Sequence, residues 1–182
     1  KSVAIATVPD FANQKNGTVY SIDLTGKNKK ELFSETSAVY LIGWSTAKNR
    51  MAYWQGCYAC DGGRTAWKMR DLQKNTSTNL VAAINSKELP YEVSISSDMT
   101  TLVYSQPTYD AAITVDGPQA YYSGAPYRVQ VTDLQTGKTT TAATIGTAGE
   151  KNPNGTDKIR ILSVGFLAGT NTPFYAEGTS LY

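Results

Sequence analysis

Short runs of alternating apolar and polar residues follow one another along almost the whole chain. In residues 128–134, for example, Val129 and Val131 alternate with Gln130 and Thr132 before the run stops at Asp133-Leu134. A period of two is typical of half-buried strands. The pattern predicts strands at residues 2–8, 19–24, 29–33, 38–45, 50–55, 65–72, 78–82, 91–96, 101–105, 127–134, 139–143, 158–167 and 173–177.

Two of these patterns recur with constant spacing. The first is a large apolar residue, a polar turn and an apolar run that closes on Tyr nine positions later; it occurs at 44–53, 95–104 and 166–175. The second is an alternating run that ends on Asp-Leu, and it occurs at 19–24, 66–72 and 128–134. Self-similarity at roughly 40 to 50 residues, with about four short strands per unit, is typical of propeller blades.

The repeats predict how the chain is divided. We expect an all-β fold, a partial β-propeller of four-stranded antiparallel blades, in which residues 1–182 form a single segment. Its expected parts are a partial blade at 1–36, a blade at 37–84, a blade at 85–145 with an insertion at 106–126, and a partial blade at 146–182. Closed propellers have typically 4 to 8 blades, so we expect a fragment of a larger propeller. The first residue, Lys1, is consistent with a processed, trimmed or partial chain.

Composition agrees with this fold class and narrows the chemistry. Twelve Tyr and three Trp favour strands, and 182 residues suffice for one domain with a real core. The net charge of +2 is spread without basic runs, which argues against nucleic acid or anionic lipid as partners. No apolar stretch approaches the ~20 residues of a membrane-spanning helix, and residues 1–10 do not resemble a signal peptide.

The sequence contains no His. A Ser-His-Asp or Cys-His nucleophile pair and a His-ligated metal therefore cannot be built from this chain alone. We predict no catalytic residue, no metal site and no cofactor within it.

The repeat resembles that of TolB-like proteins. Their blades carry a Trp-Ser-Pro-Asp-Gly-Lys-like turn leading to an Ile-Ala-Tyr-like strand, a pattern similar to residues 95–105 and to Trp44-Ser45 with Met51-Ala52-Tyr53. The Pro of that turn is missing from every copy here, and only Asp98 keeps the Asp. The resemblance covers nearly the whole chain. It implies an exported bacterial protein, periplasmic, cell-surface or secreted, that acts by docking partners.

Cys57 and Cys60 lie in a loop between two predicted strands, and three interpretations compete. A metal site needs about four thiolate or imidazole ligands, more than this chain offers. A redox pair needs its first Cys at a helix N-terminus, whereas this motif lies in a hairpin loop. A local disulfide that shapes the hairpin tip is favoured, and it would suit an oxidising compartment.

The insertion at 106–126 is the strongest candidate for recognition. It and its border carry the aromatic residues Tyr109, Tyr121, Tyr122 and Tyr127 among Pro and Gly. Rigid aromatic side chains on a loop are typical of interaction surfaces. The alternative is that these rings cover the edge of their own blade. Asp110 and Asp116-Gly117 vaguely suggest a calcium loop, but they lack its alternating acidic spacing.

Two further patterns have simple explanations. Asp23, Asp71 and Asp133 end equivalent strands of different blades, so we expect each to accept hydrogen bonds from its own turn. Glycosylation sequons occur at Asn16, Asn75 and Asn154, but Asn-rich turns produce this pattern by chance, so we infer nothing from them.

Taken together, these features predict a non-enzymatic, exported β-propeller scaffold that mediates protein–protein interaction, as part of a larger envelope or surface assembly. Its partners would be proteins or the remaining blades. The alternative is the propeller portion of a prolyl-oligopeptidase-like serine peptidase, or of another hydrolase, with its catalytic residues outside this chain. A sugar-binding or sugar-cleaving propeller is a third possibility, which would need His or clustered carboxylates from further blades.

Overall fold

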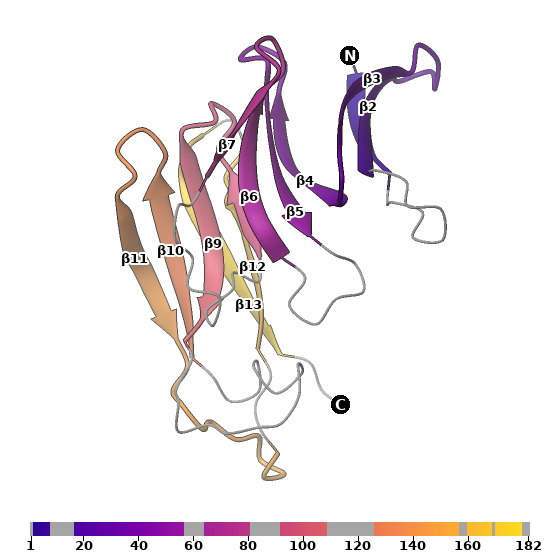
Figure 1. The fold of residues 1–182 in the computed structure, drawn as a ribbon. Helices are drawn as coiled ribbons and strands as arrows, with labels where there is room; N and C mark the ends of the chain where they lie inside the picture. Colours follow the sequence, from indigo (N-terminus) through magenta and orange to yellow (C-terminus); the bar gives the residue numbers. More distant parts are fainter. Residues whose placement is uncertain are drawn as a thin grey trace. The chain divides into compact units, whose positions relative to one another are not determined.

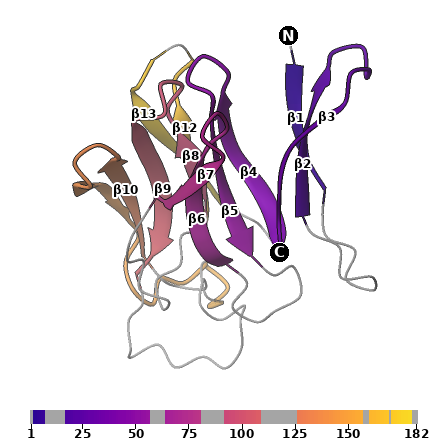
Figure 2. The same cartoon turned by 45° about the horizontal axis from the view of Figure 1, so that its top comes forward.

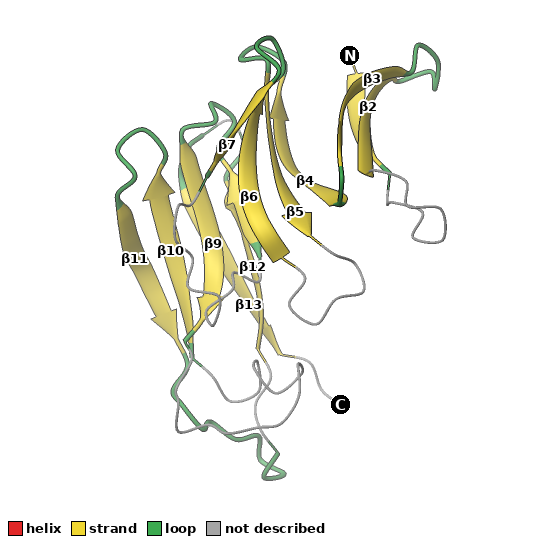
Figure 3. Ribbon diagram, viewed as in Figure 1, coloured by secondary structure: helices red, strands yellow, loops and turns green. Residues whose placement is uncertain are grey.

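The computed structural model describes residues 2–7, 17–56, 64–80, 92–108, 126–156, 160–168 and 170–179, and every regular element in these ranges is a β-strand (Figure 3). These ranges contain no helix of the length and apolarity that a membrane span requires. The strands are β1 (Ser2–Ala6), β2 (Gly17–Asp23), β3 (Lys30–Glu35), β4 (Ala38–Ser45), β5 (Arg50–Gly56), β6 (Arg64–Asp71), β7 (Thr76–Asn79), β8 (Val93–Ile95), β9 (Thr101–Pro107), β10 (Tyr127–Asp133), β11 (Thr139–Ile145), β12 (Arg160–Phe166) and β13 (Pro173–Thr179).

Within each sheet, strands that are consecutive in sequence pair antiparallel, which gives three meanders and one hairpin (Figure 1). Their strand orders are β1-β2-β3, β4-β5-β6-β7, β11-β10-β9-β8 and β12-β13. The predicted all-β fold of four-stranded antiparallel blades flanked by partial ones is therefore confirmed. The chain divides into two compact units, Lys1–Ala82 and Ala83–Tyr182, and each unit holds two of the sheets.

The predicted strands are confirmed, and β7 shows the largest difference in position. It runs from Thr76 to Asn79, whereas the sequence pattern placed it at 78–82. The reason is the tight turn after β6, where Asp71 Oδ1 accepts the backbone amides of Gln73 at 3.1 Å and Lys74 at 2.9 Å. Asn75 then adopts a φ of 57°, so the chain reverses and pairs with β6 from Thr76 onward.

The second and third sheets repeat one another down to single hydrogen bonds. The amide of Leu72 donates to the carbonyl of Asn49, and the amide of Leu134 donates to that of Thr100, both at 2.8 Å. The sequence repeat aligns Asn49 with Thr100. In both blades the Leu that follows Asp thus ties the end of the third strand to the hairpin turn between the first two.

The first unit has its core between its two sheets. The buried side chains are Val19, Phe33, Val39, Met51 and Tyr53. Gly17, at the start of β2, lies against the segment that leads into β4, since a Cβ at this position would be only 2.4 Å from the carbonyl oxygen of Ser37. This contact is backbone to backbone, so the first unit depends on having no side chain at residue 17.

The second unit has a similar core between its two sheets. Its buried side chains are Val103, Tyr127, Val129, Ile145 and Leu162. Gly165, near the end of β12, is buried under the ring of its cross-strand neighbour Phe174, which lies 2.9 Å from the position a Cβ would take. Here the close contact is made by a side chain that is itself 42% exposed.

The two partial sheets carry exposed apolar side chains. Val3 and Ile5 on β1 are 46% and 45% exposed, and Figure 2 shows β1 at the edge of its sheet. Tyr175 on β13 is 47% exposed, although the Tyr residues that the repeat aligns with it, Tyr53 and Tyr104, are 0% and 5% exposed. The same sequence position is therefore buried in the complete blades and open in the two-stranded one.

Candidate functional site

Most of the residues singled out in the sequence lie outside the described part of the chain. These are Cys57, Cys60, Tyr109, Asp110, Asp116, Gly117, Tyr121 and Tyr122. The disulfide, the aromatic interaction loop and the acidic loop stay predictions.

Tyr127 is the one residue of the predicted aromatic loop that the structure describes. It is 1% exposed at the start of β10 and belongs to the core cluster of the second unit, together with Val103 and Leu162. Its ring therefore packs inside its own unit. This position agrees with the alternative in which the ring covers its own blade, and it gives no support to a surface role for Tyr127.

The three aspartates at the ends of strands act as turn anchors, as predicted. Asp23 Oδ1 accepts the backbone amides of Thr25 and Lys27, both at 2.9 Å, and Asp133 Oδ1 accepts those of Gln135 at 2.8 Å and Thr136 at 3.0 Å. These donors stabilise the carboxylate form. The pKa of Asp23 is accordingly lowered, mainly by the Thr25 hydroxyl, and the pKa of Asp133 is lowered mainly by the Thr136 amide.

Asp98 differs from those aspartates because one of its partners lies outside its own turn. Its Oδ1 accepts the hydroxyls of Ser96 at 2.6 Å and Thr100 at 2.8 Å, and its Oδ2 accepts the side-chain amide of Asn171 at 2.6 Å. The Ser96 hydroxyl is the main reason that the pKa of Asp98 falls to about 2. Because Asn171 lies in the β12–β13 turn, this carboxylate links the two sheets of the second unit.

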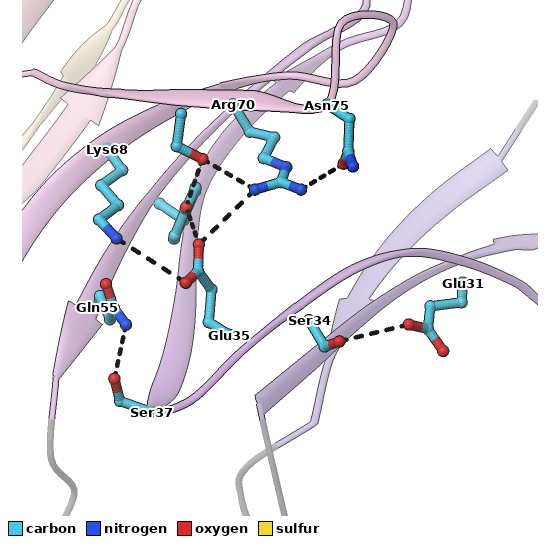
Figure 4. A network of polar contacts seen from close by, with 10 residues as sticks. Glu31, Ser34, Glu35, Ser37, Gln55, Lys68, Arg70 and Asn75 are labelled. Carbon is cyan, nitrogen blue, oxygen red and sulfur yellow. Dashed lines mark hydrogen bonds and ion pairs between the residues drawn. The ribbon is translucent and has the colours of Figure 1, made fainter.

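The first unit contains a polar cluster that the sequence analysis missed. We call it the Glu35 cluster; it comprises Glu35, Tyr53, Lys68, Arg70, Asn75 and Ser77 (Figure 4). Glu35 ends β3 of the first sheet, whereas its partners belong to the second sheet. The Tyr53 hydroxyl donates to Glu35 Oε1 at 2.5 Å, and Lys68 Nζ lies 3.8 Å from Glu35 Oε2.

Arg70 completes the Glu35 cluster from the opposite side. Its Nη1 lies 4.0 Å from Glu35 Oε1 and donates to Ser77 Oγ at 3.1 Å, while its Nη2 donates to Asn75 Oδ1. The guanidinium also stacks over the ring of Phe33, 4.9 Å from the ring centre. One carboxylate thus faces two cations, and Arg70 is additionally held by an aromatic ring of the opposite sheet.

The chemistry of the Glu35 cluster is that of a structural link. Burial, and then the hydrogen bond to Glu35, raise the pKa of Tyr53 to about 12, so at neutral pH the hydroxyl stays protonated and donates a hydrogen bond to Glu35. Lys68 and Arg70 both form ion pairs with the Glu35 carboxylate.

The sequence could have indicated only part of the Glu35 cluster. Alternation along the strands places Tyr53, Lys68 and Arg70 on one face, but no local pattern marks Glu35 as their partner.

No metal centre is found in the ranges that the structure describes, where no three His, Cys, Asp or Glu side chains come together.

Within the same ranges, the second sheet carries two stacked aromatic rings. Tyr40 and Trp54 have ring centres 3.6 Å apart with planes inclined by 5°. They are cross-strand neighbours on β4 and β5, and both are half-buried.

No protein-family model matches the sequence, and no curated protein does either. Among solved structures, the fold is similar to oligogalacturonate lyase from Vibrio parahaemolyticus, at 15% identity and a TM-score of 0.51, over 80% of this chain and 37% of the lyase. Weaker likenesses are to the acylaminoacyl peptidase of Pyrococcus horikoshii (12% identity, TM-score 0.48, 81% of this chain and 23% of the peptidase) and to AtxE2 isopeptidase (14%, 0.49, 78% and 27%).

The lyase and the acylaminoacyl peptidase contain β-propeller domains. At these identities the likeness to the lyase shows the fold alone, and the other two carry no argument. The chain spans well under half the length of each of these proteins. The propeller fold is thus supported independently of the sequence repeat, while membership of the TolB-like family stays a prediction.

Proposed function

We propose that this chain supplies consecutive blades of a larger β-propeller that belongs to an enzyme, with the catalytic residues outside residues 1–182. The observation that carries the proposal is the exposure of apolar side chains on both partial sheets. Val3 and Ile5 share one face of β1, whereas Phe174 and Tyr175 are adjacent on β13 and point to opposite faces of their sheet; all four are between 42% and 47% exposed. Neighbouring blades would cover such side chains.

The acidic side chains of the described residues support a structural role for this segment. Asp23, Asp71 and Asp133 anchor turns, Asp98 joins two sheets, and Glu35 is held between Lys68 and Arg70. A carboxylate that catalyses acid–base chemistry must instead face substrate with a pKa suited to proton transfer. Asp98 and Glu35 thus join two sheets, and the other three aspartates stabilise turns within a single sheet.

The enzyme part of the proposal draws support from the fold likeness to a lyase named for its action on oligogalacturonate. Propellers also serve as scaffolds, so fold alone does not decide the activity. If the enzyme is a sugar-cleaving one, its substrate would be an acidic oligosaccharide; if it is a peptidase, its substrate would be a peptide. In both cases the substrate class is an oligomer.

The experiment starts from the longest open reading frame that contains this chain. We would assay its purified product for cleavage of oligogalacturonate and of chromogenic peptides, and label it with a fluorophosphonate probe for an activated serine. The proposal predicts one of these activities, with the essential residue mapping outside residues 1–182. A Gly-x-Ser-x-Gly segment beyond Tyr182 would indicate the peptidase.

A matched pair of variants separates a structural from a catalytic role of this segment. Glu35→Gln should lower the temperature of unfolding while leaving kcat of the folded enzyme unchanged, and Glu31→Gln on the exposed side of β3 should change neither. A large loss of kcat in folded Glu35→Gln protein would contradict the proposal. A product without either activity that instead retains a protein partner would favour the scaffold function.

A further inference from the structure

The turn at residues 152–156 contains one of the two Asn-Gly pairs in the sequence, Asn154-Gly155; the other is Asn16-Gly17. It lies between β11 and β12, and the side chains of residues 153–156 are exposed. Gly155 has a φ of +85° and open space around the position of a Cβ. Glycine is favoured at such a φ, so the turn geometry retains a residue whose amide no side chain shields.

The carboxamide of Asn154 is polarised by its own turn. Its Oδ1 accepts two hydrogen bonds from Thr156, one from the backbone amide at 3.1 Å and one from the hydroxyl at 2.6 Å. Donors aimed at a carbonyl oxygen stabilise the negative charge that develops there when a nucleophile attacks the carbon. Asn154 Cγ is therefore prepared for attack.

We propose that Asn154 is a site of spontaneous deamidation in the folded protein. Hydroxide removes the proton from the backbone nitrogen of Gly155, which attacks Asn154 Cγ. A new C–N bond forms, the Cγ–Nδ2 bond breaks and ammonia leaves, which gives a cyclic imide. Water then opens the imide at either carbonyl to yield an aspartyl or an isoaspartyl residue. One water is consumed and one ammonia is released for each event.

The attack requires one hydrogen bond to open. The amide of Gly155 donates to the carbonyl of Asn152 at 2.9 Å. A single backbone hydrogen bond contributes little to stability, so an exposed turn can open it transiently. Two other Asn residues of the chain, Asn152 and Asn16, serve as comparisons for Asn154. Asn152 precedes Pro153, whose nitrogen carries no hydrogen and cannot close the ring.

The second contrast is the other Asn-Gly pair. Gly17 is buried in β2, its backbone is paired with Glu35 on β3, and its Cα faces the carbonyl oxygen of Ser37. Swinging the Gly17 amide toward Asn16 would have to disrupt the end of β2, which is the central strand of its sheet. The fold therefore predicts that one Asn-Gly pair reacts while the identical pair is protected.

The modification alters the turn itself. The isoaspartyl product adds a methylene to the main chain between Asn152 and Thr156, whose backbone atoms are joined by a hydrogen bond of 2.8 Å. Each event also lowers the formal net charge of +2 by one, so it is visible by isoelectric focusing.

The test follows amide loss at each Asn by peptide mapping after the folded protein is kept at mildly alkaline pH. Asn154 should convert at least about tenfold faster than Asn16, because the end of a packed central strand opens less often than an exposed turn. Isoaspartyl methyltransferase should label the 154–155 peptide. In urea the two Asn-Gly pairs should react at similar rates. Equal rates in the folded protein, or an intact Asn154, would overturn the proposal.

Variants at Thr156 test the polarisation step. Thr156→Val keeps the backbone donor but loses the hydroxyl, so the rate at Asn154 should fall about two- to tenfold, the factor that one hydrogen bond supplies. Thr156→Ser retains both donors and should react like the parent. An unchanged rate in Thr156→Val would contradict the activating role of the hydroxyl.

Discussion

The two units differ in the polar contacts that link their two sheets. In the unit Lys1–Ala82, the sheets are joined through a half-buried carboxylate, Glu35, that faces two cations and a fully buried Tyr53. In the unit Ala83–Tyr182, the link is Asp98, which lies in a turn and binds the amide of Asn171. Repeats of one blade pattern thus leave the contacts between blades free to vary.

The largest expected difference in stability between the two units comes from substituting the closely packed glycine of each unit. Gly17→Ala should destabilise the first unit by about 3 kcal/mol or more, because the new Cβ would meet a backbone oxygen at 2.4 Å that cannot rotate away. Gly165→Ala should cost the second unit only about 1 kcal/mol, because the exposed ring of Phe174 can turn aside.

Trp fluorescence and circular dichroism separate these effects. Trp44, Trp54 and Trp67 are the only three Trp in the sequence, and all belong to the first unit. Urea unfolding followed by Trp emission therefore reports that unit, and far-UV circular dichroism reports both. A Gly17→Ala variant with unchanged Trp unfolding would show that the contact at Ser37 is not restrictive.

Removing one hydroxyl tests the Glu35 cluster. Tyr53→Phe should lower the free energy of unfolding of the first unit by about 1 to 3 kcal/mol, because half-buried Glu35 and Ser77 lose a partner. The aligned but exposed Tyr175→Phe is the control and should have almost no effect. Comparable losses in both variants would contradict the importance of the cluster.

The same variant has a signature at alkaline pH. A pKa raised from 10.0 to about 12 means that folding favours the neutral hydroxyl of Tyr53. Its contribution is complete below pH 10 and is lost as the pH rises from 10 to about 12. The stability difference between the parent and Tyr53→Phe should therefore shrink in this range.

Reduction of Cys57 and Cys60 should have a smaller effect, confined to the first unit. If the predicted disulfide forms, its short loop contributes at most about 2 kcal/mol, and Trp-monitored unfolding should shift slightly with reductant. A thiol titration should then find no free thiol before reduction and two afterwards. Two free thiols in protein isolated from its native compartment would contradict both the disulfide and the expected export.

Asp98 should give the smallest effect at neutral pH and a clear one in acid. Asp98→Asn weakens the bonds to Ser96, Thr100 and Asn171 and should cost about 1 kcal/mol. With a pKa lowered from 3.8 to about 2, the carboxylate stabilises the fold above pH 3.8 and loses this effect as the pH falls toward 2. The difference in free energy of unfolding between the parent and Asp98→Asn, measured by circular dichroism, should therefore disappear as the pH falls over that range. A gap that stays constant would contradict this role.

Much of the fold could be predicted from the sequence because propeller blades repeat. The β4 strand was predicted at its observed residues, 38–45, since Trp44-Ser45 and Tyr53 recur at fixed distances in other blades. The ends of β7 could not be predicted, because they depend on how tightly the Asp71 turn closes and on a left-handed Asn75.

The candidate sites were harder to predict, for a physical reason. Turn anchors such as Asp23 and Asp133 act within a few residues, so local spacing reveals them. Glu35 and Asn171 act on other sheets of their units, and a pairing across sheets leaves no periodic trace in one sequence. For Tyr127 the sequence left two interpretations open, a recognition surface and a cover for its own blade; its buried place at the start of β10 agrees with the second.

The central claim is that further blades of the same propeller cover the partial sheets. Amide hydrogen exchange of the longest protein that contains this chain tests it most directly. We predict that β1 and β13 are protected to the same degree as β9 and β10, the central strands of a complete sheet. Rapid exchange along β1 and β13, as expected for strands with open edges, would contradict the claim.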